Sequence, residues 1–231
     1  MRNFGFMFLA LALILALAPA ASAQPTGLYF TPKVGFAVMK AGIDANADLE
    51  GYGPWKITEG TGYKGKVILG LAAGYDFKPI YDVPLRAEFE YAWRDKIKEN
   101  WAYNGVSEKV EVGAQHSFFI NVYFDIYNSS PVTPYVGAGL GLASVSGKYM
   151  VTYGGDTIDV KKSKTNFAWN IGAGAAWKIS DNVALDLGYR YADFGKVSAS
   201  GETQLFGLDL LFDGKFDVAA HEVMLGLRYT F

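Results

Sequence analysis

The chain has 231 residues, of which 51% are hydrophobic and 19% charged, and it contains no cysteine and two histidines. The absence of cysteine excludes disulfides, thiol nucleophiles and Cys-ligated metals, and two histidines are too few for a His-rich metal site. The 21 basic and 23 acidic residues are nearly balanced, so the charge gives no sign of a nucleic-acid partner. The apolar content argues against a disordered chain.

The N-terminal segment has the composition of a secretory signal peptide. Arg2 precedes an uncharged apolar run from Phe4 to Ala18, and Ala21-Ser22-Ala23 forms a small-x-small cleavage site. The apolar run is short for a membrane-spanning helix. We therefore expect residues 1–23 to be a cleaved signal peptide and residues 24–231 to form one domain. The alternative is an uncleaved N-terminal anchor.

The rest of the chain alternates between apolar and polar residues with a period of two, which is typical of β-strands. Between Val83 and Trp93, for example, apolar residues occupy the odd positions, whereas Arg86, Glu88 and Glu90 occupy even ones. The alternation predicts eight strands: Phe30–Val38, Val67–Phe77, Val83–Trp93, Val110–Ile126, Pro134–Leu142, Phe167–Ile179, Val183–Tyr191 and a last one containing Val223–Phe231.

The connections between the predicted strands alternate between long and short. The long ones cover residues 41–63, 95–109, 144–163 and 195–217, and the short ones cover 78–82, 127–131 and 180–182. Outer-membrane barrels have short periplasmic turns and longer extracellular loops. The predicted fold class is therefore all-β: an eight-stranded antiparallel up-and-down transmembrane β-barrel. Its place is the outer membrane of a Gram-negative cell, with both chain ends on the periplasmic side.

We expect the apolar face of each strand to point outward, toward lipid. A small barrel has room inside only for side chains, and rings such as Phe89, Trp93 and Phe118 would crowd it. The opposite face combines glycines with charges of both signs, which suits a narrow polar lumen; Phe119 and Tyr123 are exceptions on that face. Large aromatic residues near the strand ends are typical of interfacial girdles. The alternative is a soluble, lipocalin-like barrel with the faces reversed.

Three short stretches resemble a known family. The last residues, Met224–Phe231, resemble the terminal strand signature of bacterial outer-membrane proteins, which the barrel assembly machinery reads. The stretches Pro134–Gly141 and Asn170–Ala175 resemble the fifth and sixth strands of the opacity-protein and surface-antigen family. The transmembrane domain of OmpA shares this architecture. The resemblance implies an eight-stranded outer-membrane barrel and an assembly signal at Tyr229 and Phe231.

The main candidate site is the set of charges predicted to line the lumen. These are Lys33, Asp76, Arg86, Glu88, Glu90, Arg94, Glu111, Asp125, Lys178, Asp186, Arg190, Glu222 and Arg228. We expect them to form ion pairs that plug the lumen, because buried charges must be paired and hydrogen-bonded. Two alternatives are a narrow polar pore and a catalytic pair formed by Glu88 and Glu90.

Two weaker motifs suggest other chemistry. His116-Ser117 contains the residue types of a lipid hydrolase, but strand parity places the two side chains on opposite faces. Asp44-x-Asn46-x-Asp48 resembles the start of a calcium loop. That loop needs glycine at its sixth position and glutamate at its twelfth, where this chain has Leu49 and Trp55. We expect a solvated acidic loop there.

The apolar run Leu205–Phe212 in the fourth long connection is either a strand extension or a surface patch. From these features we predict a surface protein with a structural or loop-mediated interaction role, without enzymatic activity or cofactor. The alternatives are a small porin-like channel and a lipid-modifying enzyme. The expected partners are outer-membrane lipid and lipopolysaccharide, the barrel assembly machinery and an extracellular ligand, and we expect no nucleic acid.

Overall fold

The computed structural model describes residues 26–49, 53–103, 106–153, 156–205 and 208–231, so the predicted signal peptide lies outside the described residues. The described strands are β1 (Leu28–Leu49), β2 (Gly53–Asp76), β3 (Leu85–Arg94), β4 (Ile97–Tyr103), β5 (Val106–Asp125), β6 (Val132–Tyr153), β7 (Asp156–Lys178), β8 (Val183–Leu205) and β9 (Leu208–Thr230). A short helix, α2 (Lys78–Tyr81), follows β2. Within these ranges, no helix combines the length and hydrophobicity that a membrane crossing requires.

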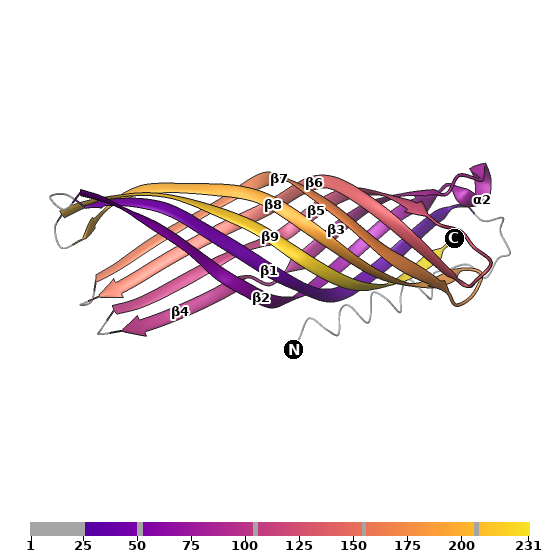
Figure 1. Cartoon of the computed structure of the whole chain (residues 1–231), viewed down its shortest axis with the longest axis horizontal. Helices are drawn as coiled ribbons and strands as arrows, with labels where there is room; N and C mark the ends of the chain where they lie inside the picture. Colours follow the sequence, from indigo (N-terminus) through magenta and orange to yellow (C-terminus); the bar gives the residue numbers. More distant parts are fainter. Residues whose placement is uncertain (1–25, 50–52, 104–105, 154–155, 206–207) are drawn as a thin grey trace.

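The strands form a closed antiparallel barrel (Figure 1). Strands that follow one another in the chain pair with each other, except β3 and β4, and β1 closes the ring on β9, with Phe36 opposite Val223. In the half that holds the chain ends, β3 pairs with both β2 and β5, which gives the predicted eight-stranded ring. The third strand is interrupted at Asp95 and Lys96, and its continuation, β4, pairs with β5.

Most strands are much longer than the sequence predicted. The strands β1, β2 and β6 to β9 have 22 to 24 residues each, whereas about 9–11 residues suffice to cross a membrane. The predicted long connections at 41–63, 95–109, 144–163 and 195–217 were wrong, because most of these residues lie in paired strands. In sequence these segments resemble loops, because their outward-facing residues are polar and bulges interrupt the alternation. In the structure their backbone groups pair with neighbouring strands.

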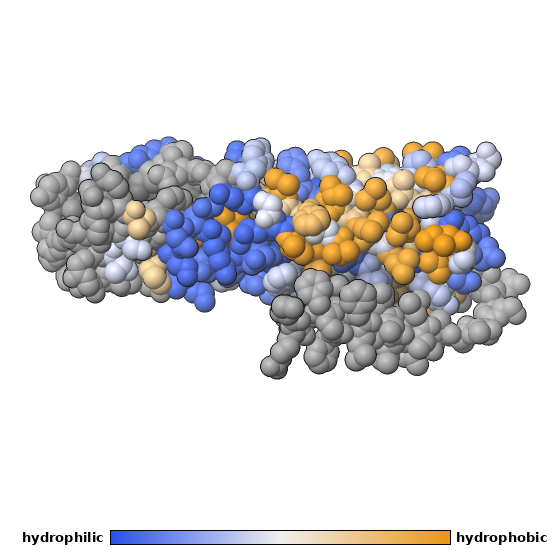
Figure 2. Space-filling model, turned by 90° about the horizontal axis from the view of Figure 1, so that it is seen from below, coloured by the Kyte–Doolittle hydropathy of each residue, from blue (hydrophilic) through white to orange (hydrophobic). Residues whose placement is uncertain are grey.

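The outward orientation of the apolar face is confirmed in the half of the barrel near the chain ends. Leu140 has 61% of its surface exposed, whereas the adjacent Gly139 is buried. Figure 2 shows the hydrophobic residues of one face gathered over this half, with hydrophilic residues next to them along the barrel. This apolar belt has the position and composition of a membrane-spanning band, and the short turns at its end are those of a periplasmic side.

Beyond the belt, the barrel wall has the opposite polarity. Exposed residues there include Lys40, Asp44 and Lys161, while Met39 and Val145 are completely buried inside. The sequence prediction placed Val110, Val112 and Ala114 toward lipid, and this was wrong because they point into the interior. A β-bulge between Ala114 and His116 inserts one residue and thereby exchanges the faces of β5 above it.

The extracellular half also divides into two four-stranded sheets. Pairing between β7 and β8 stops at Trp169 and Asp193, and pairing between β2 and β3 stops at Ile68 and Arg94. Above these residues, β2, β1, β9 and β8 form one sheet, named lobe A, and β4, β5, β6 and β7 form the other, named lobe B. The two lobes diverge at the left of Figure 1.

Candidate functional site

The lumen inside the apolar belt contains layers of ion pairs, the first of them near the periplasmic end. The Arg86 guanidinium donates two hydrogen bonds to Asp125, at 2.7 and 3.0 Å. Asp186 lies 3.9 Å from Arg86 and 3.7 Å from Arg228 and accepts a hydrogen bond from Tyr135. Arg86 and Asp125 are buried and the side chains of Asp186 and Arg228 are 13% exposed, so the paired geometry offsets the cost of removing these charges from water.

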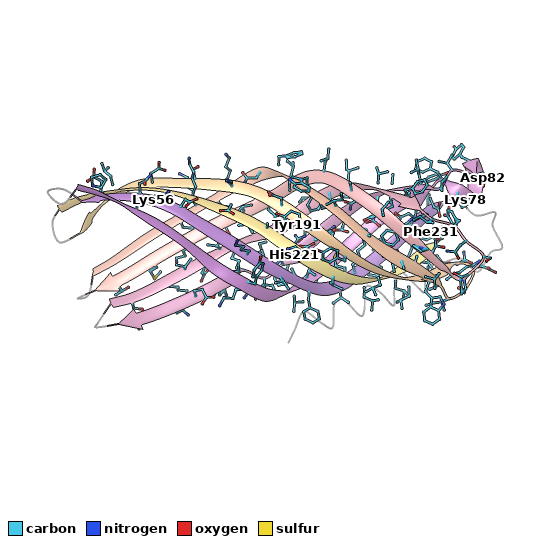
Figure 3. All side chains as sticks on the ribbon, in the orientation of Figure 1. Lys56, Lys78, Asp82, Tyr191, His221 and Phe231 are labelled. Carbon is cyan, nitrogen blue, oxygen red and sulfur yellow. The ribbon has the colours of Figure 1, made fainter. Side chains whose placement is uncertain are left out.

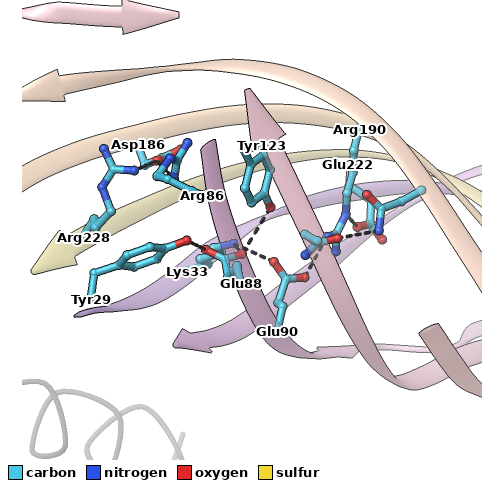
Figure 4. A network of polar contacts seen from close by, with 12 residues as sticks. Tyr29, Lys33, Arg86, Glu88, Glu90, Tyr123, Asp186, Arg190, Glu222 and Arg228 are labelled. Atoms are coloured by element: carbon cyan, nitrogen blue, oxygen red, sulfur yellow. Dashed lines mark hydrogen bonds and ion pairs between the residues drawn. The ribbon is translucent and has the colours of Figure 1, made fainter. Parts of the chain in front are cut away.

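The middle layer is centred on the ammonium group of Lys33. Its Nζ atom lies 2.6 Å from a carboxylate oxygen of Glu88 and 2.6 Å from one of Glu90. Tyr29 and Tyr123 donate their hydroxyl protons to Glu88, at 3.3 and 3.2 Å (Figure 4). Glu88 and Glu90 are therefore held by a cation between them, in contrast to a catalytic pair that shares a proton.

The third layer joins two arginines through one carboxylate. Arg190 contacts Glu222 at 2.7 Å and Glu90 at 2.7 Å, which links this layer to the middle one. Arg94 also binds Glu222, and it donates a hydrogen bond of 2.7 Å to the Ser117 hydroxyl. An ion pair thus joins the middle and third layers. The first layer contacts the middle one through Arg86, whose guanidinium lies 4.8 Å from the ring centroid of Tyr123 (Figure 4).

Two phenylalanines cover this network on its extracellular side. The Arg94 guanidinium lies 4.7 Å from the ring centroid of Phe194, and that of Arg190 lies 5.2 Å from the ring of Phe119. The two ring centroids are 6.4 Å apart. Both rings are completely buried and belong to the apolar core that fills the barrel above them. Cation–π contacts therefore join the ionic part of the lumen to the apolar part.

Glycines in the barrel wall make room for the tyrosine rings of the lumen. A Cβ atom at Gly174 would lie 2.4 Å from the Tyr135 ring, and one at Gly74 would lie 2.3 Å from the Tyr29 ring. The remaining space is small: a cavity of about 40 Å³ lies between Lys33, Asp186 and Arg190. A volume of this size holds a few water molecules.

The sequence is matched by the family of the outer membrane protein β-barrel domain, over residues 7–231. The chain belongs to this family. Its place in the outer membrane follows from this membership. The outer membrane protein PagN of Salmonella typhimurium is 30% identical over 222 residues, which cover 92% of this chain and 93% of PagN.

Two further proteins extend the comparison. A candidate adhesin of Rickettsia conorii is 30% identical over 122 residues, which cover 49% of this chain and 47% of that protein. The crystal structure of OprG from Pseudomonas aeruginosa has a TM-score of 0.55 at 16% identity and covers 90% of this chain and 98% of OprG. The likeness to OprG concerns the fold alone.

The structure places three of the predicted lumen charges outside the ion-pair network of this family member. Asp76 accepts the backbone N–H of Lys78 near the periplasmic end. The side chain of Lys178 is 60% exposed and pairs with Asp181 in a turn. Glu111 pairs with Lys109 in lobe B, because the bulge in β5 turns its side chain outward. The prediction that Glu111 and Lys178 line the lumen was wrong.

Hydrogen bonding to Lys109 lowers the pKa of the Glu111 carboxyl, as expected for a surface ion pair. The residues His116 and Ser117 lie on opposite faces: His116 is exposed and bonded to Tyr91 at 2.8 Å, and Ser117 binds Arg94 in the lumen. Neither is positioned to activate the other.

Asp44, Asn46 and Asp48 are exposed on β1, which is paired on both sides and does not curl as a calcium loop does. Within the described ranges, no three His, Cys, Asp or Glu residues gather as metal ligands do. The apolar run Leu205–Phe212 spans the β8–β9 connection; residues 206–207 and most of its side chains lie outside the described part.

The sequence prediction missed several neutral side chains that complete the lumen. The alternation places Tyr29, Tyr135 and Ser117 on the inward face of their strands, and this was the only sign of their role in the sequence. A tyrosine or serine on that face does not by itself indicate a hydrogen bond to a lumen charge. Asn121 and Asn170 bond to each other at 2.9 Å and occupy inward positions as well. Phe194 could not be found, because it follows a strand predicted to end at Tyr191.

Proposed function

We propose that this outer-membrane protein acts at the cell surface, where lobes A and B contact partners outside the cell. The observation that carries this proposal is the reversed polarity of the barrel beyond the belt. An apolar interior with a polar wall is the construction of a water-soluble sheet structure. About half of each long strand thus extends above the membrane, although a membrane anchor alone needs only the belt.

The relatives support an interaction role at the cell surface. PagN matches almost the whole chain and is an outer-membrane protein, and the Rickettsia conorii relative is described as a candidate adhesin. The ligand that we propose for this chain is accordingly extracellular and contacts the lobes. We propose no catalytic role, since the side chains of His116 and Ser117 are each engaged with other groups.

Removal of the lobes tests this proposal. Bacteria that display the full chain should adhere to cultured cells or matrix-coated surfaces more strongly than bacteria that display a barrel with residues 41–65, 97–114, 147–164 and 197–216 replaced by short turns. Surface levels of both proteins must be matched by antibody labelling of intact cells. Equal adhesion by the two proteins would refute a function of the lobes.

We further propose that the lumen is closed to ions. The ion-pair network and the Phe119–Phe194 layer support this, because any ion path would have to separate Arg94 from Glu222 and displace both rings. In planar bilayers, the purified protein should give no stable conductance steps. Steady conductance by the unaltered protein would favour the porin-like alternative.

At the level where belt and lobes meet, we propose contact with outer-leaflet lipopolysaccharide. His221 is exposed there and bonded to Tyr189 at 2.7 Å, with Tyr191 beside it (Figure 3) and Lys40 exposed on the adjacent β1. Donor groups of this kind suit phosphates and sugars at the membrane surface. Exchange of Lys40 for glutamate should lower the amount of lipopolysaccharide that copurifies with the barrel.

We also propose that Tyr229 and Phe231 form the signal for assembly. Their ring centroids are 5.1 Å apart at the periplasmic end, where Figure 3 labels Phe231, and the Phe231 amide bonds to the Leu28 carbonyl at 2.9 Å. Deletion of Phe231 should leave refolding in detergent nearly normal but reduce outer-membrane insertion in cells. Normal surface levels of the deletion variant would refute recognition by the assembly machinery.

A further inference from the structure

The seam between lobes A and B leaves strand edges without partners. β7 remains paired with β6 up to Asp156, and β8 remains paired with β9 up to Leu205. Pairing of β7 with β8 stops at Trp169 and Asp193. Within the described part of the chain, the backbone of β7 above this point therefore has a sheet neighbour on one side only. Such an edge is a template for an added strand.

Specific residues end the ladder at this seam. Gly195 has a φ of 72°, a left-handed conformation that suits glycine, and the register shifts between Asp193 and Lys196. Asp193 accepts the N–H of Gly195 at 2.8 Å. The amide of Asn166 on β7 donates to the carbonyls of Phe194 and Lys196, at 3.3 and 2.8 Å. The Asn166 side chain thus replaces the next backbone pairing between β7 and β8. The separation of the two strands above this point is therefore held by specific hydrogen bonds.

The second seam, between β2 and β4, is different. Lys64 of β2 and Glu99 of β4 form an ion pair of 2.6 Å across it, which holds the two edges together. Among the described residues, no ion pair crosses the β7–β8 seam above Asn166. The β7 edge is therefore the more accessible of the two.

The positive charge of the β7 edge indicates what kind of segment can bind there. All residues from 161 to 165 are exposed, so both faces of the strand meet solvent. Three of them are Lys161, Lys162 and Lys164, and Lys196 is exposed on the facing strand. No described carboxylate pairs with the three β7 lysines. Their charge opposes pairing of two copies of this edge and favours an acidic segment.

We propose that the β7 edge above Asn166, residues 157–165, binds an extended acidic segment of a partner protein by strand addition. Backbone hydrogen bonds along the edge provide the binding, and acidic side chains on both faces of the added strand meet Lys161, Lys162 and Lys164. This inference rests on the proposed surface function and names the class of partner that one lobe takes. A polyanion that binds by charge alone is a separate possibility, which the test distinguishes.

The test uses the full barrel, refolded in lipid nanodiscs, and a fluorescent peptide of about ten residues that alternates Glu with Thr or Val. Two matched peptides serve as controls: one with alternate backbone nitrogens methylated, and one with Lys in place of Glu. Fluorescence anisotropy at constant ionic strength should show binding of the acidic peptide. The affinity of each control peptide should be lower by about tenfold or more. Equal binding of the methylated peptide would overturn strand addition.

Variants locate the binding edge. The triple variant Lys161→Gln/Lys162→Gln/Lys164→Gln should lose about tenfold in affinity, because it removes the charge of the edge. The control, Lys56→Gln/Lys215→Gln, removes two exposed lysines of lobe A and should bind as the unaltered chain does. An equal loss in both variants would overturn the assignment to β7.

Hydrogen exchange adds a readout that charge alone does not change. Amides within residues 157–165 should become protected when the acidic peptide binds, and those of β1 should not. Absence of this protection at saturating peptide would refute the proposal. If the peptide fails to bind while lobe-dependent adhesion persists, only the edge inference is wrong; loss of lobe-dependent adhesion itself would refute the proposed function.

Discussion

The two halves of this barrel are built from the same strands in opposite ways. In the belt, Leu140 and Phe36 face outward and Arg86 and Glu222 face inward; in the lobes, Lys161 faces outward and Val145 faces inward. The backbone pairing continues from one half to the other. The difference shows that the surrounding solvent, hydrocarbon or water, decides which face of a strand carries the apolar residues.

The interiors of the two halves are held together by different interactions. The belt interior depends on charge pairs that share their members, since each carboxylate serves one or two cations. The lobe interior depends on packing of apolar side chains such as Met39, Val112 and Phe194. Substitutions should therefore have effects that depend on the half in which they lie.

The largest effect is expected in the belt interior. Glu222→Gln leaves Arg94 and Arg190 without their shared carboxylate and should lower the free energy of unfolding by about 3–5 kcal/mol. Guanidinium titration of the protein in lipid vesicles measures it. The matched change Glu111→Gln, in a surface pair of lobe B, should cost less than about 1 kcal/mol. Similar losses in both variants would contradict the contrast between the halves.

The outer surfaces provide the second comparison. Leu140→Arg places a charge in the hydrocarbon and should cost about 2–4 kcal/mol if the position is near the midplane. Thr165→Arg, on the exposed wall of lobe B, should change stability by less than about 0.5 kcal/mol. Both variants are measured by the same vesicle titration. A costly Thr165→Arg would mean that the belt extends further than the exposed residues indicate.

A smaller effect is expected in the lobe interior. Val112→Thr buries a hydroxyl group in the apolar core and should cost about 1–3 kcal/mol. The reverse exchange on the outer wall, Thr165→Val, should be nearly neutral. Hydrogen exchange of lobe amides reports the change locally. Unchanged exchange in Val112→Thr would indicate that water already reaches this part of the interior.

The smallest effect is expected at the periplasmic turn. Lys78 donates a hydrogen bond to Asp82, which lowers the pKa of that carboxyl. The stabilisation is therefore present above the ordinary pKa of an aspartate and is lost as the pH falls through the lowered value. Because Asp82 is exposed, Asp82→Asn should unfold at the same denaturant concentration as the unaltered chain, both at neutral and at acidic pH. A pH-dependent difference would show a stronger pair than the exposed geometry implies.

The sequence predicted the belt well and the lobes poorly, for a physical reason. In Val83–Trp93 the alternation is unbroken, so parity assigned every side chain to its face. A single inserted residue at Gln115 reversed the parity of Glu111 and Val112, and a bulge leaves no clear mark in one sequence. The ion-pair partners within the lumen could not be predicted either. Arg94 and Glu222, for example, are 128 positions apart, and only the strand register brings them together.

The separation of the lobes could not be predicted either. It depends on the side chain of Asn166 reaching two carbonyls of β8, whereas the sequence around Asn166 and Gly195 is compatible with continued pairing. Exposed lysines at 161, 162 and 164 were visible in the sequence, but only the structure shows that they border an unpaired edge.

The abrupt change of polarity fixes how deep the barrel sits in the bilayer. On β1, Val38 is followed at the next outward position by Lys40, and that step spans roughly 5 Å along the membrane normal for a tilted strand. Sinking by one step would take a charge of this strand toward hydrocarbon, and rising by one step would expose apolar side chains such as Phe36 to water. In bilayers of different thickness, the lipid next to the protein should therefore stretch or compress, while the barrel keeps its height.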